Sequence, residues 1–347
     1  MHHEHGGNIY KYSNNNLIDF SANINPYGIP SNVKQAMHDA IDLCIHYPEP
    51  NADRLKHALA EKYNLKPENF FCSNGAAEIF YRLVNVIKPK SAIITAPTFS
   101  EYEQALLSVN CEIKHHFLLK ENDFSLTNSI LSDLDDNIDI CILCNPNNPT
   151  GKTINTNLMN KIIKKCDENS IYLIIDECFL DFIDNEKELS VLNNKSNNLI
   201  IVKAFTKMYA LAGVRLGFCI SHNVDLINKL SYFGQPWNTS VIAQQAGLAA
   251  LKLTDYPKKI AQNIKVLRDI LYLELKKLNL TVFYGEANYL LFYTFDFKLH
   301  EKLLKYNILI RNCENYIGLN KGYYRVAVRT EEENNKLIKA IKEVLKN

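Results

Sequence analysis

The sequence has no apolar run near the roughly 20 residues that a helix needs to cross a bilayer. Its polar start, Met1 to His5, does not resemble a signal peptide. Neither charge predominates, because 39 lysines and arginines stand against 38 aspartates and glutamates. This balance provides neither a basic surface for nucleic acid nor an acidic tail. We therefore expect a soluble cytoplasmic protein that binds a small molecule, with no nucleic-acid partner and no membrane partner.

The number and spacing of the cysteines do not indicate a disulfide framework. Nine of them, an odd number, are scattered over 347 residues, which favours reduced core thiols over disulfides. Cys141 and Cys144 have C-x-x-C spacing, but they lie inside the apolar run 138–144. No second pair lies nearby to complete the four ligands of a structural zinc site. Core packing is the better interpretation, and no metal site is predicted.

The length exceeds that of a usual single domain, so we expect a large domain with a smaller companion. Residues 1–30 are rich in Gly, Asn and His and carry no long periodic segment, which is typical of a mobile terminus or of an arm that closes over a site. We place the large domain at 31–252. A long amphipathic helix from Tyr256 then leads into a small domain at 253–347.

Five apolar runs alternate with helical patterns such as 33–45 and 51–63, and they lie at 92–95, 138–144, 171–175, 199–202 and 216–220. Continuous apolar strands separated by helices predict an α/β domain whose mostly parallel sheet is covered on both faces. Shorter strand and helix patterns after residue 279 predict a small α+β domain. In open parallel sheets, ligands bind beyond the carboxyl ends of the strands. We therefore expect 145–151, 176–179 and 206–207 to border one crevice.

Lys207 follows one of these runs, beside Thr206 and eight residues before Arg215. An amine attacks a carbonyl carbon only in its neutral form, and burial near Arg215 lowers a lysine pKa by desolvation and like-charge repulsion. The segment therefore suits a Schiff-base lysine beside a phosphate site. Taken alone, it is equally compatible with two ordinary basic residues on a loop.

Upstream residues supply further signals for the same site. Asp176 ends an apolar run, and a buried carboxylate requires a cationic partner, such as a pyridinium nitrogen. A helix that opens at Gly75 and Ala76 presents free amides and a dipole to a phosphate. Asn148, in a proline-rich turn, can donate to a phenolate oxygen, and Phe99 offers a face for ring stacking. Each signal also has an ordinary explanation as a capped helix, a turn or a core side chain.

In this order, the residues resemble fold-type I pyridoxal-phosphate enzymes of the aspartate aminotransferase superfamily, in the histidinol-phosphate aminotransferase branch, over essentially the whole chain. The resemblance implies pyridoxal 5'-phosphate as the cofactor and Lys207 as the lysine that binds it. It implies further cofactor contacts from Gly75, Ala76, Phe99, Asn148, Asp176, Thr206 and Arg215. Tyr47 of a neighbouring subunit would also reach the phosphate, which implies a homodimer with shared active sites. Ala204 departs from the pattern, since many relatives have a serine there.

Within this branch, the segments 5–8, 21–26 and 308–315 resemble threonine-phosphate decarboxylases most. That resemblance implies decarboxylation of L-threonine O-3-phosphate to (R)-1-aminopropan-2-yl phosphate and CO2, for the nucleotide loop of cobalamin. The implied substrate contacts are His5, Asn23, Asn25, Arg311 and Arg325. How Arg311 and Arg325 divide the carboxylate and the phosphate stays open.

Phe179 adds a chemical argument for the decarboxylase. Aminotransferases of this branch usually have a tyrosine there, whose hydroxyl bonds the ring oxygen of the cofactor, and phenylalanine cannot make that bond. Neutral drift at a replaceable contact would explain the same residue. A histidinol-phosphate aminotransferase is therefore the alternative, and a phosphoserine decarboxylase, whose substrate differs by one methyl group, is a variant of the first hypothesis. A non-catalytic protein that keeps the fold is the alternative from another class.

Overall fold

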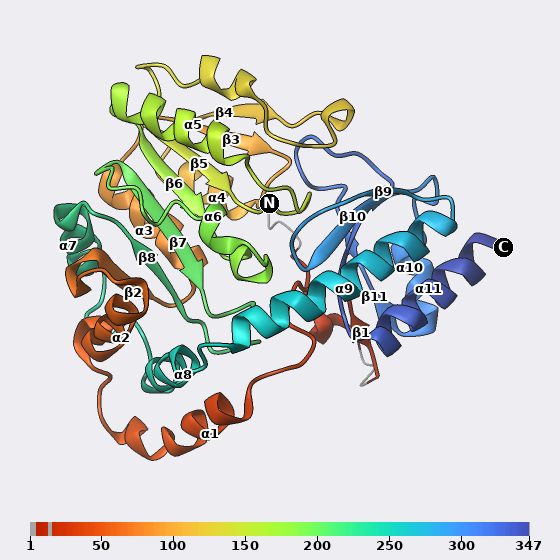
Figure 1. The fold of residues 1–347 in the computed structure, drawn as a ribbon, viewed down its shortest axis with the longest axis horizontal. Helices are drawn as coiled ribbons and strands as arrows, with labels where there is room; N and C mark the ends of the chain where they lie inside the picture. The colour runs from red at the N-terminus through yellow and green to blue at the C-terminus, as the bar shows by residue number, and fades with distance from the viewer. Residues whose placement is uncertain (1–4, 13–15, 347) are drawn as a thin grey trace.

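The computed structural model describes residues 5–12 and 16–346. The first four residues, on which part of the predicted arm and the polar start depend, lie outside this part of the chain. A large sheet, a smaller antiparallel sheet and flanking helices make up the fold (Figure 1). No helix in the described ranges is long and apolar enough to span a bilayer.

The large sheet has seven strands, and only β8 runs antiparallel to its neighbours. In spatial order they are β2 (Phe70–Ser73), β8 (Gly217–Ile220), β7 (Leu199–Ala204), β6 (Tyr172–Asp176), β5 (Ile140–Cys144), β3 (Ser91–Ala96) and β4 (Glu112–Phe117). The mostly parallel sheet predicted from the apolar runs is confirmed. The prediction missed β2, which is only four residues long, and β4, an edge strand with alternating polar residues rather than an apolar run.

Helices cover both faces of this sheet because alternate strand residues point to opposite sides. In β5, Cys141 and Leu143 join one apolar cluster, whereas Ile140 and Ile142 join another. The first cluster includes side chains of α2 (Asp53–Tyr63), α5 (Thr156–Glu168) and α8 (Val241–Leu251). The second includes α3 (Ala76–Ile87), α4 (Glu101–Leu107) and α7 (Val224–Tyr232). Two further helices, α1 (Ser31–Asp39) and α6 (Glu186–Leu189), complete this part.

The helix predicted over 33–45 is wrong in its second half. α1 ends at Asp39, and a separate 3-10 helix follows at Asp42–Ile45. Side chains of the 3-10 helix face outward, since Leu43 is 45% and Ile45 is 83% exposed. The apolar side chains of this segment therefore do not pack on the core of the chain. Without such packing, a continuation of α1 is not stabilised.

The smaller sheet is antiparallel in the order β12 (Arg311–Asn312), β13 (Tyr323–Ala327), β10 (Tyr289–Tyr293) and β9 (Thr281–Phe283). Three helices accompany it, namely α9 (Tyr256–Lys277), α10 (Leu299–Leu303) and α11 (Glu331–Lys346). α9 crosses from the large sheet to the small one (Figure 1). The domain boundary at 252/253 stays a prediction, and it falls between the end of α8 and the start of α9.

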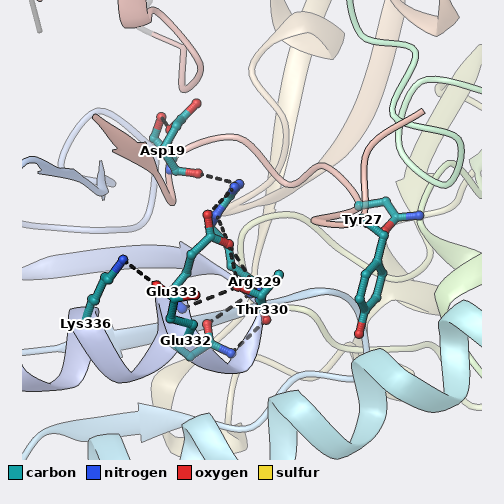
Figure 2. A network of polar contacts seen from close by, with 10 residues as sticks. Asp19, Tyr27, Arg329, Thr330, Glu332, Glu333 and Lys336 are labelled. Carbon is teal, nitrogen blue, oxygen red and sulfur yellow. Dashed lines mark hydrogen bonds and ion pairs between the residues drawn. The ribbon is translucent and has the colours of Figure 1, made fainter. Parts of the chain in front are cut away.

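The N-terminal arm packs on the side of the molecule that contains the small sheet. β1 (Ile18–Asp19) pairs in parallel with β11 (Ile308–Leu309). Figure 2 shows Arg329 between the arm and α11: Nη1 donates to Asp19 O at 3.1 Å, and Nε and Nη2 bond the Glu333 carboxylate at 3.1 and 3.0 Å. Thr330 and Glu333 form a reciprocal cap at the start of α11. The arm between residues 18 and 23 is therefore an integral part of the fold.

Candidate active site

Three parallel strand ends meet at one edge of the large sheet. In the register, Cys144 of β5 lies opposite Asp176 of β6, which in turn lies opposite Val202 of β7. The alignment continues past β5, because Asn145 N donates to Asp176 O at 2.9 Å. The segments that follow β5, β6 and β7 therefore begin side by side.

Asp176 is a buried carboxylate with two donors. Its Oδ2 accepts from the Tyr102 hydroxyl at 2.6 Å, and its Oδ1 accepts from Cys178 N at 2.9 Å. Within residues 5–12 and 16–346, no cationic side chain forms an ion pair with Asp176. A buried carboxylate without a counter-cation is costly. Asp176 is therefore suited to bind a cationic atom of a ligand.

Lys207 lies in the loop between β7 and β8. Its backbone carbonyl accepts from Asn25 N at 3.1 Å, and its Nζ lies 5.5 Å from the centre of the Phe179 ring. Desolvation lowers the pKa of Lys207 to about 8, and the guanidinium groups of Arg325 and Arg215 act in the same direction. A large fraction of the amine is therefore neutral near pH 8, which is the form that attacks a carbonyl.

Lys203, four residues earlier, has the opposite electrostatic environment. Its Nζ lies 3.0 Å from Asp181 Oδ1 and 3.5 Å from Glu177 Oε2. Desolvation lowers the pKa of Lys203, but Asp181 and Glu177 outweigh it and hold the pKa well above its ordinary value. Lys203 is therefore a fixed cation, and of these two lysines only Lys207 is suited to be a nucleophile.

We expect Lys207 to react in the cofactor-free protein with a midpoint near pH 8. Below this pH the unreactive ammonium form predominates, and above it the neutral amine does, so the acylation rate rises with pH through this window. Limited acetylation from pH 7 to 11 followed by peptide mapping measures the profile, with Lys203 as the protected reference. A Lys207 midpoint near 10.5 would contradict the desolvated environment.

The start of α3 and the start of β8 form a cup. Gly75 has φ +92° and carries no side-chain cap for the helix, so the first amides of α3 stay available. A Cβ on Gly75 would lie 2.5 Å from Arg215 Nη2, and a Cβ on Gly217 would lie 2.6 Å from Ala76 N. Phe205 N donates to Leu216 O at 3.2 Å, which holds the segment before Thr206 against Arg215. Free amides, a helix dipole and a guanidinium at one place suit a phosphate.

Arg325 of β13 lies at the centre of a second set of contacts. It donates through Nη2 to Ser21 O at 2.6 Å and through Nη1 to the side-chain oxygen of Asn148. Its guanidinium carbon lies 5.5 Å from the Tyr289 ring. Its Nε is buried and has no hydrogen-bond partner in the described ranges. An arginine this buried, with a donor unused, suits a carboxylate or phosphate ligand.

Arg311 lies beside Arg325 on the neighbouring strand, in register. Its Nη2 donates to Asn315 Oδ1 at 2.7 Å, and its guanidinium carbon lies 5.4 Å from the Tyr316 ring. Tyr316 also accepts a hydrogen bond from Arg325 Nη1 at 3.4 Å. The two arginines therefore lie on adjacent strands with a shared tyrosine, and both are buried.

The three substrate contacts predicted in the N-terminal arm, His5, Asn23 and Asn25, differ in their surroundings. His5 Nε2 lies 2.8 Å from Glu101 Oε1, and the His5 ring lies 6.0 Å from Phe99. Asn23 is 2% exposed, and its Oδ1 has no hydrogen-bond partner in the described part of the chain. Asn25 uses both N–H groups of its amide inside the protein, so it has no donor left for an anionic substrate in this arrangement.

The remaining predicted residues divide by burial. Thr206 is buried, and Phe99 packs edge-on against Tyr102 with ring centres 5.5 Å apart. Tyr47, in contrast, is 78% exposed, and its ring stacks on Trp237 at 4.5 Å. An exposed aromatic pair is more readily covered by another subunit than by its own chain.

Residues 15–341 match the family of class I and II aminotransferases. The chain belongs to this family. It is 35% identical to threonine-phosphate decarboxylase of Salmonella typhimurium, over 98% of this chain and 96% of that protein. It is also 35% identical to an adenosylcobalamin biosynthesis bifunctional protein of Leptospira interrogans, over 98% of this chain and 41% of that protein. The structure of histidinol-phosphate aminotransferase from Clostridium acetobutylicum is similar, with a TM-score of 0.89, 30% identity, and 95% of this chain and 100% of that chain covered.

Class I and II aminotransferases are pyridoxal-phosphate enzymes, and the residues of this chain fit that cofactor. The cup at Gly75 admits no Cβ and faces Arg215, as a phosphate site requires. Among the described residues Asp176 has no cationic partner, which a pyridinium nitrogen would supply, and Lys207 has the lowered pKa of an amine that forms a Schiff base. The predicted family, fold and cofactor are confirmed, whereas the role of each residue stays a prediction.

Sequence reasoning missed two aromatic residues of this site. Tyr102 bonds Asp176, and Tyr289 donates to Asn147 O at 2.9 Å while its ring packs edge-on against Phe179 at 5.0 Å. Phe99 lies before α4, which begins at Glu101, so the three-residue spacing from Phe99 to Tyr102 is not a helical spacing and gave no signal for Tyr102. Tyr289 lies in an ordinary strand pattern, which carried none.

Proposed function

We propose that this protein decarboxylates L-threonine O-3-phosphate to (R)-1-aminopropan-2-yl phosphate and CO2, with pyridoxal phosphate as cofactor. The observation that carries the proposal is the 35% identity, over nearly the full length of both chains, to a threonine-phosphate decarboxylase. The similarity to a bifunctional protein of adenosylcobalamin biosynthesis supports a role of this protein in the biosynthesis of cobalamin. Histidinol-phosphate transamination is the second candidate, favoured by the structural similarity at 30% identity.

Pyridoxal phosphate, when bound, supplies an electron sink for the bond to Cα that is to be broken. The Gly75–Ala76 amides, Thr206 and Arg215 would hold its phosphate. Asp176 would hold its ring nitrogen. Asn148 would contact the ring oxygen, and Phe99 would stack on the ring.

Arg325 and Arg311 would set the orientation of the substrate. Both carry buried guanidinium groups on adjacent strands, and a planar guanidinium suits bidentate contacts with a carboxylate or a phosphate. His5 and Asn23 of the arm would add contacts from the other side, while Asn25 holds the Lys207 loop through Met208 O at 2.7 Å. Fixing the remote phosphate fixes the rotation about Cα, and hence which bond is broken.

Lys207 would serve twice. As a neutral amine, which its lowered pKa permits, its Nζ would hold the cofactor covalently. Once free and protonated by the ammonium group of the incoming substrate, the same Nζ would be the acid that gives a proton to Cα after CO2 has left. The arm and the small domain would exclude water during these steps.

The same proposal includes a homodimer with shared sites. Tyr47 and Trp237 stack on each other, and large apolar side chains close to them in the sequence are also exposed, namely Ile41, Leu43, Ile45, Tyr232 and Phe233. Exposed apolar side chains of this kind are typical of a protein interface. Analytical ultracentrifugation should give about twice the chain mass of 39.8 kDa, and Tyr47→Ala should weaken cofactor binding.

Phe179 provides a prediction about reaction type. Phe179→Tyr restores the hydroxyl that transaminating relatives use at the ring oxygen. We expect CO2 release to fall by about two- to tenfold, the range of one hydrogen bond, and the keto product of threonine phosphate to become detectable. Mass spectrometry of both products measures the ratio. An unchanged ratio would mean that this position does not select the reaction.

Product analysis tests the proposed function itself. Cofactor-loaded protein is mixed with threonine phosphate and no keto acid, and CO2 and the amine are followed by mass. Catalytic release of both supports the decarboxylase. No CO2, with conversion of histidinol phosphate once 2-oxoglutarate is added, would establish an aminotransferase instead. Phosphoserine in a parallel reaction measures the selectivity for the methyl group, which a pocket distinguishes by only about 1–3 kcal/mol.

A further inference from the structure

Ser21 lies where the N-terminal arm meets the small sheet. It is buried, with 3% of its surface exposed. Its backbone oxygen accepts a hydrogen bond from Arg325 Nη2 at 2.6 Å, and its Oγ accepts one from Gly7 N at 2.7 Å. Gly7 belongs to the turn that directly follows His5, and we call residues 5–7 the His5 turn. One buried serine therefore contacts both the central arginine of the site and the His5 turn.

Asp19 sets the direction of the Ser21 hydroxyl. Its Oδ1 accepts from Ser21 Oγ at 2.6 Å and from Ser21 N at 2.7 Å. Because the hydroxyl proton goes to Asp19, the lone pairs of Oγ face away from it and can accept from Gly7 N. Asp19 belongs to β1, which pairs with β11. The His5 turn is therefore bonded, through Ser21, to a carboxylate that the strand pairing holds in place.

The backbone of the His5 turn packs directly against Ser21. A Cβ on Gly6 would lie 2.1 Å from Ser21 O, so position 6 requires glycine in this arrangement. Gly7 has φ +85°, a conformation that favours glycine as well. This close approach brings the His5 ring to 6.0 Å from the Phe99 ring, measured between ring centres. A residue that bonds Gly7 therefore also fixes where the imidazole lies relative to the site.

A second contact of the His5 turn is more exposed. His5 Nε2 lies 2.8 Å from Glu101 Oε1, but the His5 side chain is 46% exposed. An exposed pair of this kind contributes little, because water screens it and two flexible side chains must be ordered. The bond from Gly7 N ends on a buried serine whose hydroxyl is already oriented. It therefore costs less conformational entropy and is the stronger restraint on the turn.

We propose that Ser21 is a positioning residue that ties the His5 turn to Arg325, so that a phosphorylated substrate is held at two points a fixed distance apart. The inference rests on the proposed function. Arg325 bonds Asn148, the predicted contact of the cofactor ring, so it would take the carboxylate next to Cα, and the His5 turn would take the phosphate. A preset distance between the two contacts raises affinity, because the arm is already ordered when the substrate binds. Loss of the hydroxyl frees the turn, whereas the backbone oxygen of residue 21 still accepts from Arg325.

Ser21→Ala tests the proposal, and Ser221→Ala is the matched control. Ser221 is 2% exposed, and its Oγ likewise accepts from a backbone amide, Asn223 N at 3.2 Å, and donates to an oxygen, Leu199 O at 2.9 Å. Leu199 begins β7, whereas Lys207 follows the other end of that strand. The comparison therefore separates release of the His5 turn from the loss of a buried serine hydroxyl in general.

For Ser21→Ala we expect the KM of threonine phosphate to rise about fivefold, the value of one hydrogen bond, with kcat within about twofold of the parent. The inhibition constant of L-threonine, which lacks the phosphate, should not change. In the ligand-free protein, hydrogen exchange at Gly7 N, measured by NMR, should become about fivefold faster, because the amide loses its acceptor. Gly6→Ala should produce the same pattern, since its Cβ displaces the turn and leaves Ser21 intact. Ser221→Ala should change none of these quantities.

A KM and a Gly7 exchange rate equal to the parent's in Ser21→Ala would overturn the proposal. An equal rise of the L-threonine inhibition constant would overturn it too, because Ser21 would then act through Arg325 rather than through the His5 turn. A parent protein that does not convert threonine phosphate would contradict the proposed function instead. In that case Gly7 exchange still decides on Ser21: faster exchange in Ser21→Ala supports the restraint on the turn, and unchanged exchange overturns it. Should Ser21→Ala not fold, Gly6→Ala provides the same comparison.

Discussion

Lys207→Ala should abolish catalysis, with CO2 release reduced by about three orders of magnitude or more. The variant loses both the covalent attachment of the cofactor and the proton donor to Cα. It should also lose the visible absorption band of the lysine-bound cofactor. Neighbouring Lys203 cannot substitute, because Asp181 and Glu177 hold its pKa well above the ordinary value despite its burial.

Lys207→Arg is the matched control for this prediction. It keeps a positive charge in the loop but cannot form a Schiff base, so it should be as inactive as Lys207→Ala. Addition of a small primary amine should restore part of the activity of Lys207→Ala, because an external amine can take over the proton transfer. Turnover of Lys207→Ala at the parent rate would contradict the whole assignment of the site.

Arg325→Gln should have the second largest effect, a fall in kcat/KM of about 10²- to 10³-fold, which is typical for the loss of one partner of a buried charge contact. Within residues 5–12 and 16–346 the Nε donor of the buried guanidinium has no partner. Arg311, on the neighbouring strand, is the other cation in the strands of the small sheet. The variant also removes donors from Ser21 O and Asn148, so the free energy of unfolding should fall by about 1–3 kcal/mol. Steady-state kinetics and urea unfolding measure the two effects.

Arg329→Gln separates chemistry from attachment of the arm. Arg329 follows β13 closely and also holds the arm, through Asp19 O at 3.1 Å, but its other partner is Glu333 of α11 (Figure 2). Arg329→Gln should lower the free energy of unfolding by about 1 kcal/mol or less, because a partly exposed ion pair contributes little to stability. It should leave kcat/KM within about threefold of the parent. If both variants lose activity equally, Arg325 acts only by holding the arm.

The large sheet was predictable because strands buried on both faces are continuous apolar runs, as Ile140–Cys144 and Leu199–Ala204 are. Polar residues directly after such runs fall at the carboxyl edge of the sheet, which is why Asp176 and Lys207 could be predicted as neighbours. β4 could not be found in this way. It is an edge strand, and the sequence Glu112–Phe117 alternates in burial instead of being apolar throughout.

Contacts made across long separations in the sequence were not predictable. Asn25 bonds Met208 O and the Tyr256 hydroxyl, which lie 183 and 231 residues away. The arm motif alone suggested a substrate contact, whereas the tertiary fold uses both N–H groups of this amide to hold the lysine loop. Tyr102 is similar, because a tyrosine on a helix reveals its partner only when α4 and the end of β6 are brought together.

The central claim is that the bond between Cα and the carboxylate carbon of the substrate breaks. Hydrogen isotopes test this claim most directly. The loaded protein is incubated with threonine phosphate in D2O without a keto acid, and substrate and product are analysed by mass and NMR. The account predicts an amine with one deuterium on the carbon that lost CO2, next to unexchanged substrate hydrogen on that same carbon. Threonine phosphate recovered with deuterium at Cα, and no CO2, would show that the site breaks the C–H bond instead and would contradict the account.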